Sequence, residues 1–194
     1  MAELFDPLPL RGVTLPNRIG VSPMCEYSAE DGFAGDWHLV HLGSRAVGGA
    51  GLVLTEAAAV EDRGRITPLD LGIWKDAHVE GLARISRFIE AQGAVPGVQL
   101  AHAGRKASSA VPWEGGRGLA AQAGGWQVIA PSALAFSAES VPPREMSEGD
   151  IRTVQEAFVA GARRALGAGF RVLELHFAHG YLGHSFLSPL SNHR

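Results

Sequence analysis

Apolar residues along this chain fall into short runs, separated by longer segments in which apolar positions recur at helical spacing. The short runs predict four strands, at 17–21, 51–56, 95–100 and 172–175. The second run, Gly-Leu-Val-Leu-Thr-Glu, is mostly apolar, as is typical of a parallel strand buried on both faces.

Three helices are predicted between these strands from apolar positions three and four residues apart. Asp36 and Asp76 are good N-cap residues for the first two helices. Ser147 and Asp150 approximate a capping box at the start of the third. Each helical segment runs into a glycine, which is a common helix stop.

Strand and helix therefore alternate, and this order predicts one α/β domain over residues 1–194, with a parallel sheet and right-handed crossovers. Four βα units fit either an open doubly wound sheet or half of an eightfold barrel, and periodicity alone does not choose between them. Residues 4–15 are expected to form a short hairpin or irregular segment. Residues 101–145 are expected to form a long loop of the kind that serves a site.

Composition and charge exclude several classes of protein. The chain has 46% hydrophobic and 19% charged residues, typical of a globular protein and not of a disordered one. A net charge of −3 offers no electrostatic footprint for nucleic acid. No apolar run approaches the roughly 20 residues that a membrane span requires. One cysteine and no visible signal peptide lead us to expect a cytoplasmic protein.

Polar groups gather at the end of the fourth strand. Alternation places Val172, Glu174 and His176 on one face, and His176, His179 and Tyr181 follow where the strand becomes a loop. Ligands bind at such strand ends in α/β proteins. The two histidines could be a metal pair, but zinc sites need a third protein ligand and no His-Glu-x-x-His pattern is present. Hydrogen bonding to a carbonyl oxygen is the favoured interpretation.

Other candidates follow the first and third strands. Cys25 is either a small inert side chain or a site residue, and Tyr27 two residues later is expected at the same sheet edge as His176. Lys106 is either solvated or a site lysine; a Schiff-base role would require burial to lower its pKa. Gln99 is a polar group at a core position, which suggests a hydrogen-bonding role.

Taken together, the motifs of this chain resemble the Old Yellow Enzyme family, and the Cys25 and His-x-x-His details resemble its thermophilic-like branch of NADPH dehydrogenases and xenobiotic reductases. The motifs lie in the family's order from end to end. They are Ser-Pro-Met-Cys-x-Tyr at 22–27, Gly-Arg-Ile-Thr-Pro at 64–68, Gln-Leu-Ala-His-Ala-Gly-Arg-Lys-Ala at 99–107, Ala-Pro-Ser-Ala at 130–133, His-Phe-Ala-His-Gly-Tyr-Leu at 176–182 and Phe-Leu-Ser-Pro-Leu-Ser-Asn-His-Arg at 186–194.

The resemblance implies a (β/α)₈ barrel that binds FMN, takes hydride from NADPH and reduces the activated double bond of an α,β-unsaturated carbonyl compound. It also implies four further strands after the last residue given, so we expect the amino-terminal half of such an enzyme, truncated or incompletely predicted from its gene. Val53 and Val172 are expected to face the open barrel interior, and self-association is expected from the two open sheet edges.

The same resemblance implies roles for individual residues. His176 and His179 would bind the substrate carbonyl, and Tyr181 would protonate the α-carbon. Tyr27 and Lys106 would help to hold the substrate. Six residues would line the flavin: Ser22, Pro23, Met24, Cys25, Ala57 and Gln99.

Two other functions stay open. A half barrel could serve as a dimerising or binding module without catalysis, or Lys106 could act in a lysine-dependent lyase. The full-length form of the implied oxidoreductase is expected to be a homo-oligomer, with no nucleic acid and no membrane as partner.

Overall fold

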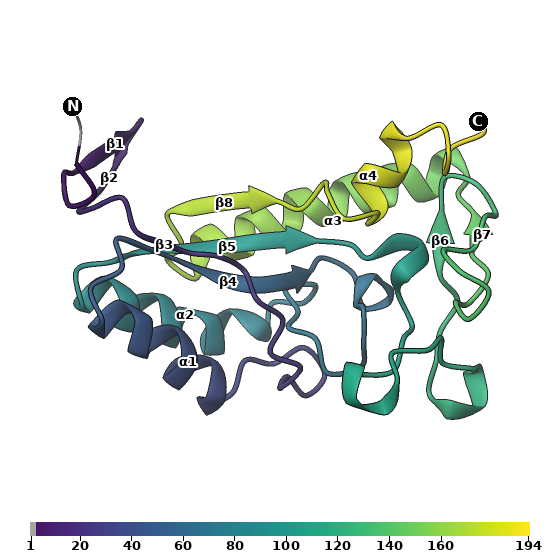
Figure 1. The fold of residues 1–194 in the computed structure, drawn as a ribbon, viewed down its shortest axis with the longest axis horizontal. Coiled ribbons are helices and arrows are strands. Elements are labelled where there is room, and N and C mark those ends of the chain that lie inside the picture. The colour runs from purple at the N-terminus through teal and green to yellow at the C-terminus, as the bar shows by residue number, and fades with distance from the viewer. Residues whose placement is uncertain (1–2) are drawn as a thin grey trace.

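Four parallel strands form the central sheet of the computed structural model, which describes residues 3–194 (Figure 1). The strands are ordered in space as they are in the sequence, so each pairs with the strand of this sheet that comes before it in the chain. Their order is β3 (Gly20–Val21), β4 (Leu52–Ala59), β5 (Val95–Ala101) and β8 (Val172–Leu175). A doubly wound sheet reverses its strand order at a switch point, whereas a barrel keeps it sequential. The strand order therefore favours half of a barrel.

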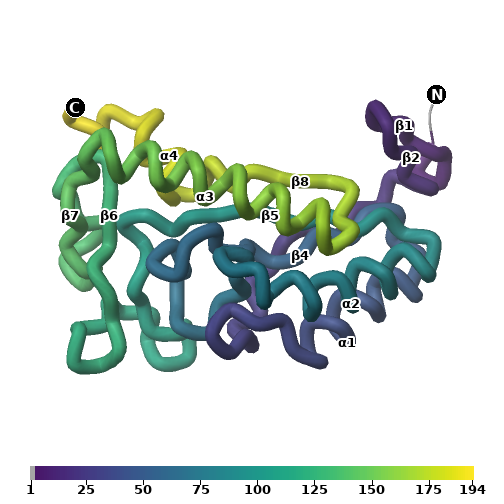
Figure 2. The backbone as a smooth tube through the Cα atoms, turned by 180° about the vertical axis from the view of Figure 1, so that it is seen from behind, coloured from purple at the N-terminus to yellow at the C-terminus, as the bar shows by residue number. Residues whose placement is uncertain are grey.

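Three helices connect these strands and cover one face of the sheet: α1 (Asp36–Val47), α2 (His78–Ala91) and α3 (Glu148–Gly167). One buried cluster joins Val98 of β5 to Leu82 of α2 and Ala165 of α3, so both helices lie against the same side of that strand. α3 lies behind β5 in Figure 1 and in front of the strands in the reverse view of Figure 2. Helices on a single face are the arrangement of a barrel wall.

The inner face of the sheet was predicted correctly for β8 and wrongly for β4. Val172 lies opposite Gly97, and Glu174 lies opposite Gln99 and accepts a hydrogen bond from its amide, so both face away from the helices. Val53 is instead fully buried, in the cluster that packs against α1 and α2. The expectation that Val53 faces the barrel interior is wrong, because the opposite set of alternating residues in β4 points inward.

Helix starts depart from the sequence prediction at two of three sites. Asp36 is the first residue of α1 and Gly35 takes the N-cap position. Asp76 lies two residues before the start of α2 and does not cap it. The capping box of α3 is confirmed, with Ser147 and Asp150 each accepting a hydrogen bond from the other's backbone N–H.

The remaining elements are short. The predicted amino-terminal hairpin is confirmed as the antiparallel pair β1 (Leu8–Leu10) and β2 (Val13–Leu15). The expected loop at 101–145 also contains 3₁₀ turns and two-residue strands, β6 (Ile129–Ala130) and β7 (Arg144–Glu145). A short helix, α4 (Leu182–Leu187), follows β8.

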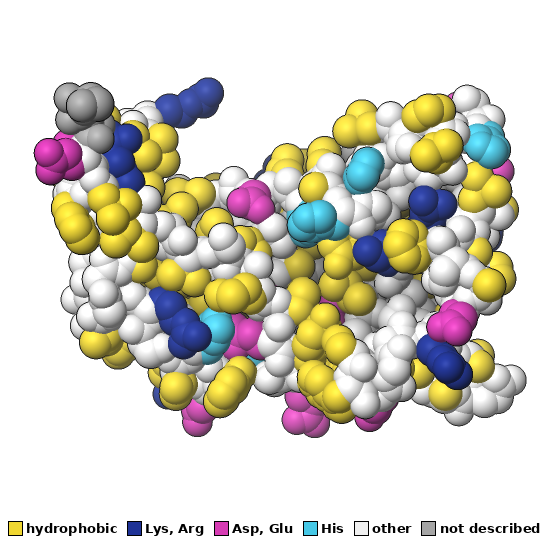
Figure 3. Space-filling view, in the orientation of Figure 1, with side chains coloured by type: hydrophobic (Ala, Val, Ile, Leu, Met, Phe, Trp, Pro, Cys, Tyr) yellow, Lys and Arg dark blue, Asp and Glu magenta, His cyan; other side chains and the backbone are white. Residues whose placement is uncertain are grey.

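Apolar side chains remain exposed at the end of β8, the edge strand, and in the turn after it. Leu175 and Phe177 are about half exposed, at 53% and 48%. Figure 3, in the orientation of Figure 1, shows that hydrophobic side chains are exposed on this face of the molecule. Such a surface favours association, because removing apolar area from water lowers the free energy of the system. No helix within residues 3–194 combines the length and the hydropathy needed to cross a membrane.

Candidate active site

The carboxyl ends of the four strands bring the predicted site residues to one edge of the sheet. Ala57 of β4 lies opposite Gln99 of β5, and Gln99 lies opposite Glu174 of β8. The segment 22–27 leaves the same end of β3. The prediction that these segments share one edge is confirmed.

The turn after β8 holds His176, His179 and Tyr181 together. The His176 ring lies 4.6 Å from the ring of Tyr181 and 5.1 Å from that of His179, both edge to face. His179 has a φ of 55° and Gly180 a φ of 75°, so two successive residues adopt the left-handed conformation. Strained backbone of this kind clusters at functional sites, where the surrounding contacts hold it.

Hydrogen bonding fixes the tautomer of His176. Its Nδ1 accepts from the backbone N–H of Ala178 at 3.3 Å, so its Nε2 carries the proton. Nε2 then faces Nδ1 of His179 at 3.4 Å, a long hydrogen bond that a carbonyl oxygen could replace. Burial, and then the neighbouring His179, lower the pKa of His176, so the ring is a neutral donor near pH 7.

Tyr181 is a phenol that keeps its proton. Burial raises its pKa further above the usual range, and the nearby Cys25, Asp70 and Tyr27 add to the effect. The ammonium of Lys106 lies 5.0 Å from the centre of the Tyr181 ring. The site therefore contains a protonated hydroxyl group beside the neutral imidazole of His176, with the ring of His179 next to it.

Lys106 braces the strained turn. Its Nζ donates to the backbone oxygen of His179 at 3.1 Å and lies 4.6 Å from the centre of the Phe136 ring. Burial, and then the neighbouring Arg105, lower its pKa. Gly104, two residues earlier, has a φ of 57°, and a Cβ there would come within 3.0 Å of Cα of Leu182. Glycine therefore permits the close approach that brings Lys106 to the turn.

Tyr27 and Cys25 form the opposite side of the edge. Tyr27 also adopts a left-handed conformation, with a φ of 47°, and its ring packs edge to face on Trp113 at 5.7 Å. Cys25 is half-buried. Its burial, with Asp70 and Glu56 nearby, raises the pKa of its thiol to about 12, so it is not a thiolate nucleophile at neutral pH.

Small side chains line the wall between these two sides. Ala57, Ala59, Ala101 and Ala103 line a narrow hollow beside Tyr181, and such small side chains allow close approach. Gln99 bonds Glu174 through its Nε2, which leaves its amide oxygen for a ligand. Of the other residues expected to line a flavin, Ser22 and Met24 are exposed and Pro23 is half-buried.

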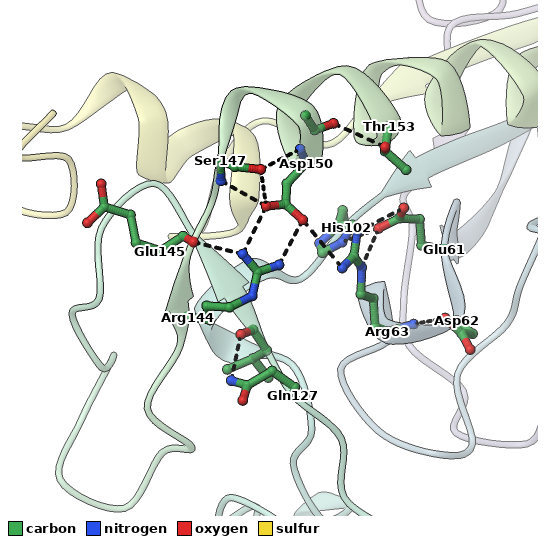
Figure 4. A network of polar contacts seen from close by, with 12 residues as sticks. Glu61, Asp62, Arg63, His102, Gln127, Arg144, Glu145, Ser147, Asp150 and Thr153 are labelled. Atoms are coloured by element: carbon green, nitrogen blue, oxygen red, sulfur yellow. Dashed lines mark hydrogen bonds and ion pairs between the residues drawn. The ribbon is translucent and has the colours of Figure 1, made fainter.

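A polar network behind this wall was not predicted from the sequence. Glu61 accepts hydrogen bonds from Nε2 of His102 at 3.1 Å and from Nε of Arg63 at 2.9 Å. Asp150 joins the network through Arg63, whose Nη1 lies 3.9 Å from Oδ1 of Asp150, and it also pairs with Arg144 at 2.7 Å (Figure 4). These residues come from the loops after β4 and β5, from β7 and from the start of α3. The network thus ties the loop that carries Lys106 to the barrel wall.

This network predicts a pH-dependent contribution to stability. Although burial opposes it, hydrogen bonds from His102 and Arg63 lower the pKa of Glu61 from 4.5 to about 2. A lowered folded pKa stabilises the fold above the unfolded pKa, so the contribution is lost as pH falls from about 4.5 to about 2. It amounts to a value on the order of 2 kcal/mol.

Urea unfolding between pH 6 and pH 3 measures this contribution. We expect Glu61→Gln to be less stable than the parent at pH 6 and to lose less stability on acidification. The exposed Glu80→Gln is the matched control and should follow the parent. Equal pH dependence in Glu61→Gln and the parent would contradict the role given to the network.

Known proteins resemble this chain in sequence and in fold. The model of the NADH:flavin oxidoreductase / NADH oxidase family matches residues 3–194. The chain is 50% identical to the NADPH dehydrogenase of Geobacillus sp. (strain WCH70), covering 98% of this chain and 52% of that protein. Morphinone reductase superposes with a TM-score of 0.86 at 30% identity, covering 98% of this chain and 52% of that one. Old Yellow Enzyme from Pichia sp. AKU4542 has a TM-score of 0.86 at 29% identity, covering 98% and 50%.

The chain thus spans about half the length of the relatives it matches. Its four βα units correspond to the amino-terminal half of their eightfold barrel, which confirms the half-barrel fold and the resemblance found in the sequence. The chain belongs to the NADH:flavin oxidoreductase / NADH oxidase family, as a half barrel of the Old Yellow Enzyme type.

Proposed function

We propose that this half barrel supplies one wall of an FMN-dependent NADPH oxidoreductase that reduces the activated C=C bond of α,β-unsaturated carbonyl compounds. The observation that carries the proposal is the turn after β8, where two imidazole rings and a protonated phenol meet within 4.6–6.5 Å between ring centres. Hydrogen-bond donors aimed at one point stabilise charge that develops on a carbonyl oxygen.

The residues along the wall fit a flavin. The small side chain of Ala57 leaves room for the flavin ring. Gln99 offers its amide oxygen as a hydrogen-bond acceptor, and Cys25 offers an uncharged thiol. Ser22, Pro23 and Met24 belong to the same loop as Cys25 and would complete the contact. Bound FMN would supply the redox chemistry, accepting hydride from NADPH and donating it to carbon.

The residues of the turn would handle the substrate. His176 and His179 would donate hydrogen bonds to the carbonyl oxygen and draw electron density from the double bond. Tyr181, which keeps its proton because its pKa is raised, would deliver that proton to the α-carbon. Lys106 would hold the turn through the His179 oxygen, and Tyr27 would limit the position of the substrate.

Because the chain spans about half of its relatives, the test requires a completed barrel. We suggest a chimera in which residues 1–194 replace the matched half of the Geobacillus NADPH dehydrogenase. A flavin spectrum and oxidation of NADPH by an enone are expected. A folded chimera without flavin would favour the alternative, a non-catalytic dimerising or binding module. Self-association of the complete enzyme stays a prediction.

Carbonyl binding predicts an effect on phenol affinity. A phenolate oxygen resembles the charged oxygen formed during reduction, and a hydrogen bond to a charged group is worth about 1.5–3 kcal/mol. His176→Ala or His179→Ala in the chimera should therefore raise the Kd of a phenol roughly ten- to hundredfold. Spectral titration measures this. The exposed His193→Ala serves as control, and unchanged affinity in both site variants would contradict the assignment.

A further inference from the structure

Behind the loop that carries Cys25, three polar side chains from separate elements converge in the interior. Glu26 follows β3, His38 lies on α1 and Glu56 lies on β4. One ligand-type atom from each lies within 4.8 Å of the others. Their side chains are only 3%, 0% and 1% exposed, respectively. The function proposed above uses none of the three.

The hydrogen bonds of His38 determine its part in this cluster. Its Nδ1 accepts from the backbone N–H of Gly35 at 3.0 Å, so Nε2 carries the proton and donates to Oε1 of Glu56 at 3.0 Å. Oε2 of Glu56 accepts from the backbone N–H of Glu26 at 3.1 Å. His38 is therefore a donor that orients Glu56, and its ring nitrogens are not free to bind a metal.

Glu26 is buried without compensation. Neither of its carboxylate oxygens has a hydrogen-bond partner among residues 3–194, and the nearest ion-pair contact is His41 Nε2 at 3.8 Å. The guanidinium of Arg45 instead donates to the His41 backbone oxygen and to Ser44 Oγ. Two buried carboxylates this close need either a proton on one of them or a bound cation that balances both charges.

Two features of the geometry favour a cation. A proton on Glu26 would form a short O–H···O hydrogen bond to Glu56, of the kind seen at about 2.5–2.7 Å between carboxyl groups. The Glu26 oxygens make no such bond. One oxygen of each carboxylate lies within 4.8 Å of the other, a separation that a single ion bound at about 2.0–2.6 Å to both can bridge. A hydrogen-bonded second residue such as His38 is typical around ligating carboxylates.

We propose that Glu26 and Glu56 bind one hard divalent cation of the Mg²⁺ or Mn²⁺ class, with His38 as the residue that orients Glu56. Only oxygen ligands are offered, and oxygen is what such cations prefer. The ion would fasten the loop that carries Cys25 to β4 and, through His38, to α1. It would thereby hold one side of the sheet edge without touching the substrate.

Mn²⁺ is the probe, because its free form gives an electron paramagnetic resonance signal that is lost on binding. Residues 1–194 are stripped with chelator and titrated with Mn²⁺, and metal content is checked after dialysis. We expect one Mn²⁺ per chain. Glu26→Gln, which keeps the shape and removes the charge, should weaken binding at least a hundredfold. Glu30→Gln, an exposed carboxylate on the same loop, should bind as the parent does.

Thermal unfolding gives an independent readout. Ligand linkage predicts a rise in Tm of roughly 5–10 °C for the parent at about 100 times its Kd, and none for Glu26→Gln. Absence of bound Mn²⁺ in the parent, or equal binding in Glu26→Gln, would overturn the proposal. If Glu26→Gln does not fold, the parent titration alone decides. If Glu26→Gln is more stable than the parent and Mn²⁺ changes neither, a proton occupies the site and the proposal fails.

Discussion

Replacing Tyr181 by Phe in the completed barrel is expected to slow the reduction of an enone about 10²–10⁴-fold, because the α-carbon loses its proton donor. The phenol lies 4.6 Å, ring to ring, from His176, and its raised pKa keeps the proton available. Reduction of the enzyme by NADPH involves no such proton transfer and should keep its rate.

Stopped-flow traces of the two half-reactions measure this effect separately. The NADPH half-reaction serves as the internal control for folding and for occupancy by flavin. If enone reduction runs at the same rate in Tyr181→Phe and in the parent, Tyr181 is not the proton donor. In that case the phenol would only shape the site.

The second large effect is loss of flavin and of turnover when residues 1–194 are produced alone. The four strands supply one wall, whereas phosphate sites in such barrels are frequently built from the loops after strands seven and eight. Charge-assisted hydrogen bonds to phosphate are strong, so a wall without them should bind FMN weakly. Exposed Leu175 at the end of the edge strand and Phe177 just after it should also promote self-association.

Desalting after incubation with excess FMN, followed by a visible spectrum and light scattering, checks this expectation. The chimera treated in the same way is the control and should stay yellow. A yellow monomer of residues 1–194 that oxidises NADPH with an enone would show that half the barrel is enough.

The parallel sheet could be predicted because alternation of strand and helix leaves few other arrangements. The choice between a barrel and an open sheet required the pairing of β5 with β4 and β8, which no local pattern encodes. The prediction succeeded at Ser147, where a reciprocal pair of polar residues specifies the start of the helix. It failed at Asp36, because a single acidic residue is as favourable in the first turn of a helix as at the N-cap position.

The clustering of candidate site residues was predictable where they are close in sequence. His176, His179 and Tyr181 follow one strand, so their proximity is local. Glu61 and His102 meet from loops 41 residues apart, and their contact depends on the register of β4 and β5. The burial of Glu26 was not predictable, because a single acidic residue in a loop is usually solvated and this burial depends on how α1 packs.

The most direct test of the central claim follows the atoms through the reaction. The chimera is incubated with NADPH and a cyclic enone in D₂O, and the product is analysed by mass spectrometry and NMR. We predict a saturated ketone whose β-carbon receives its hydrogen from NADPH and remains free of deuterium, with deuterium at the α-carbon. An allylic alcohol, or no product from a folded, flavin-loaded chimera, would contradict the claim that His176, His179 and Tyr181 form the wall of an ene-reductase site.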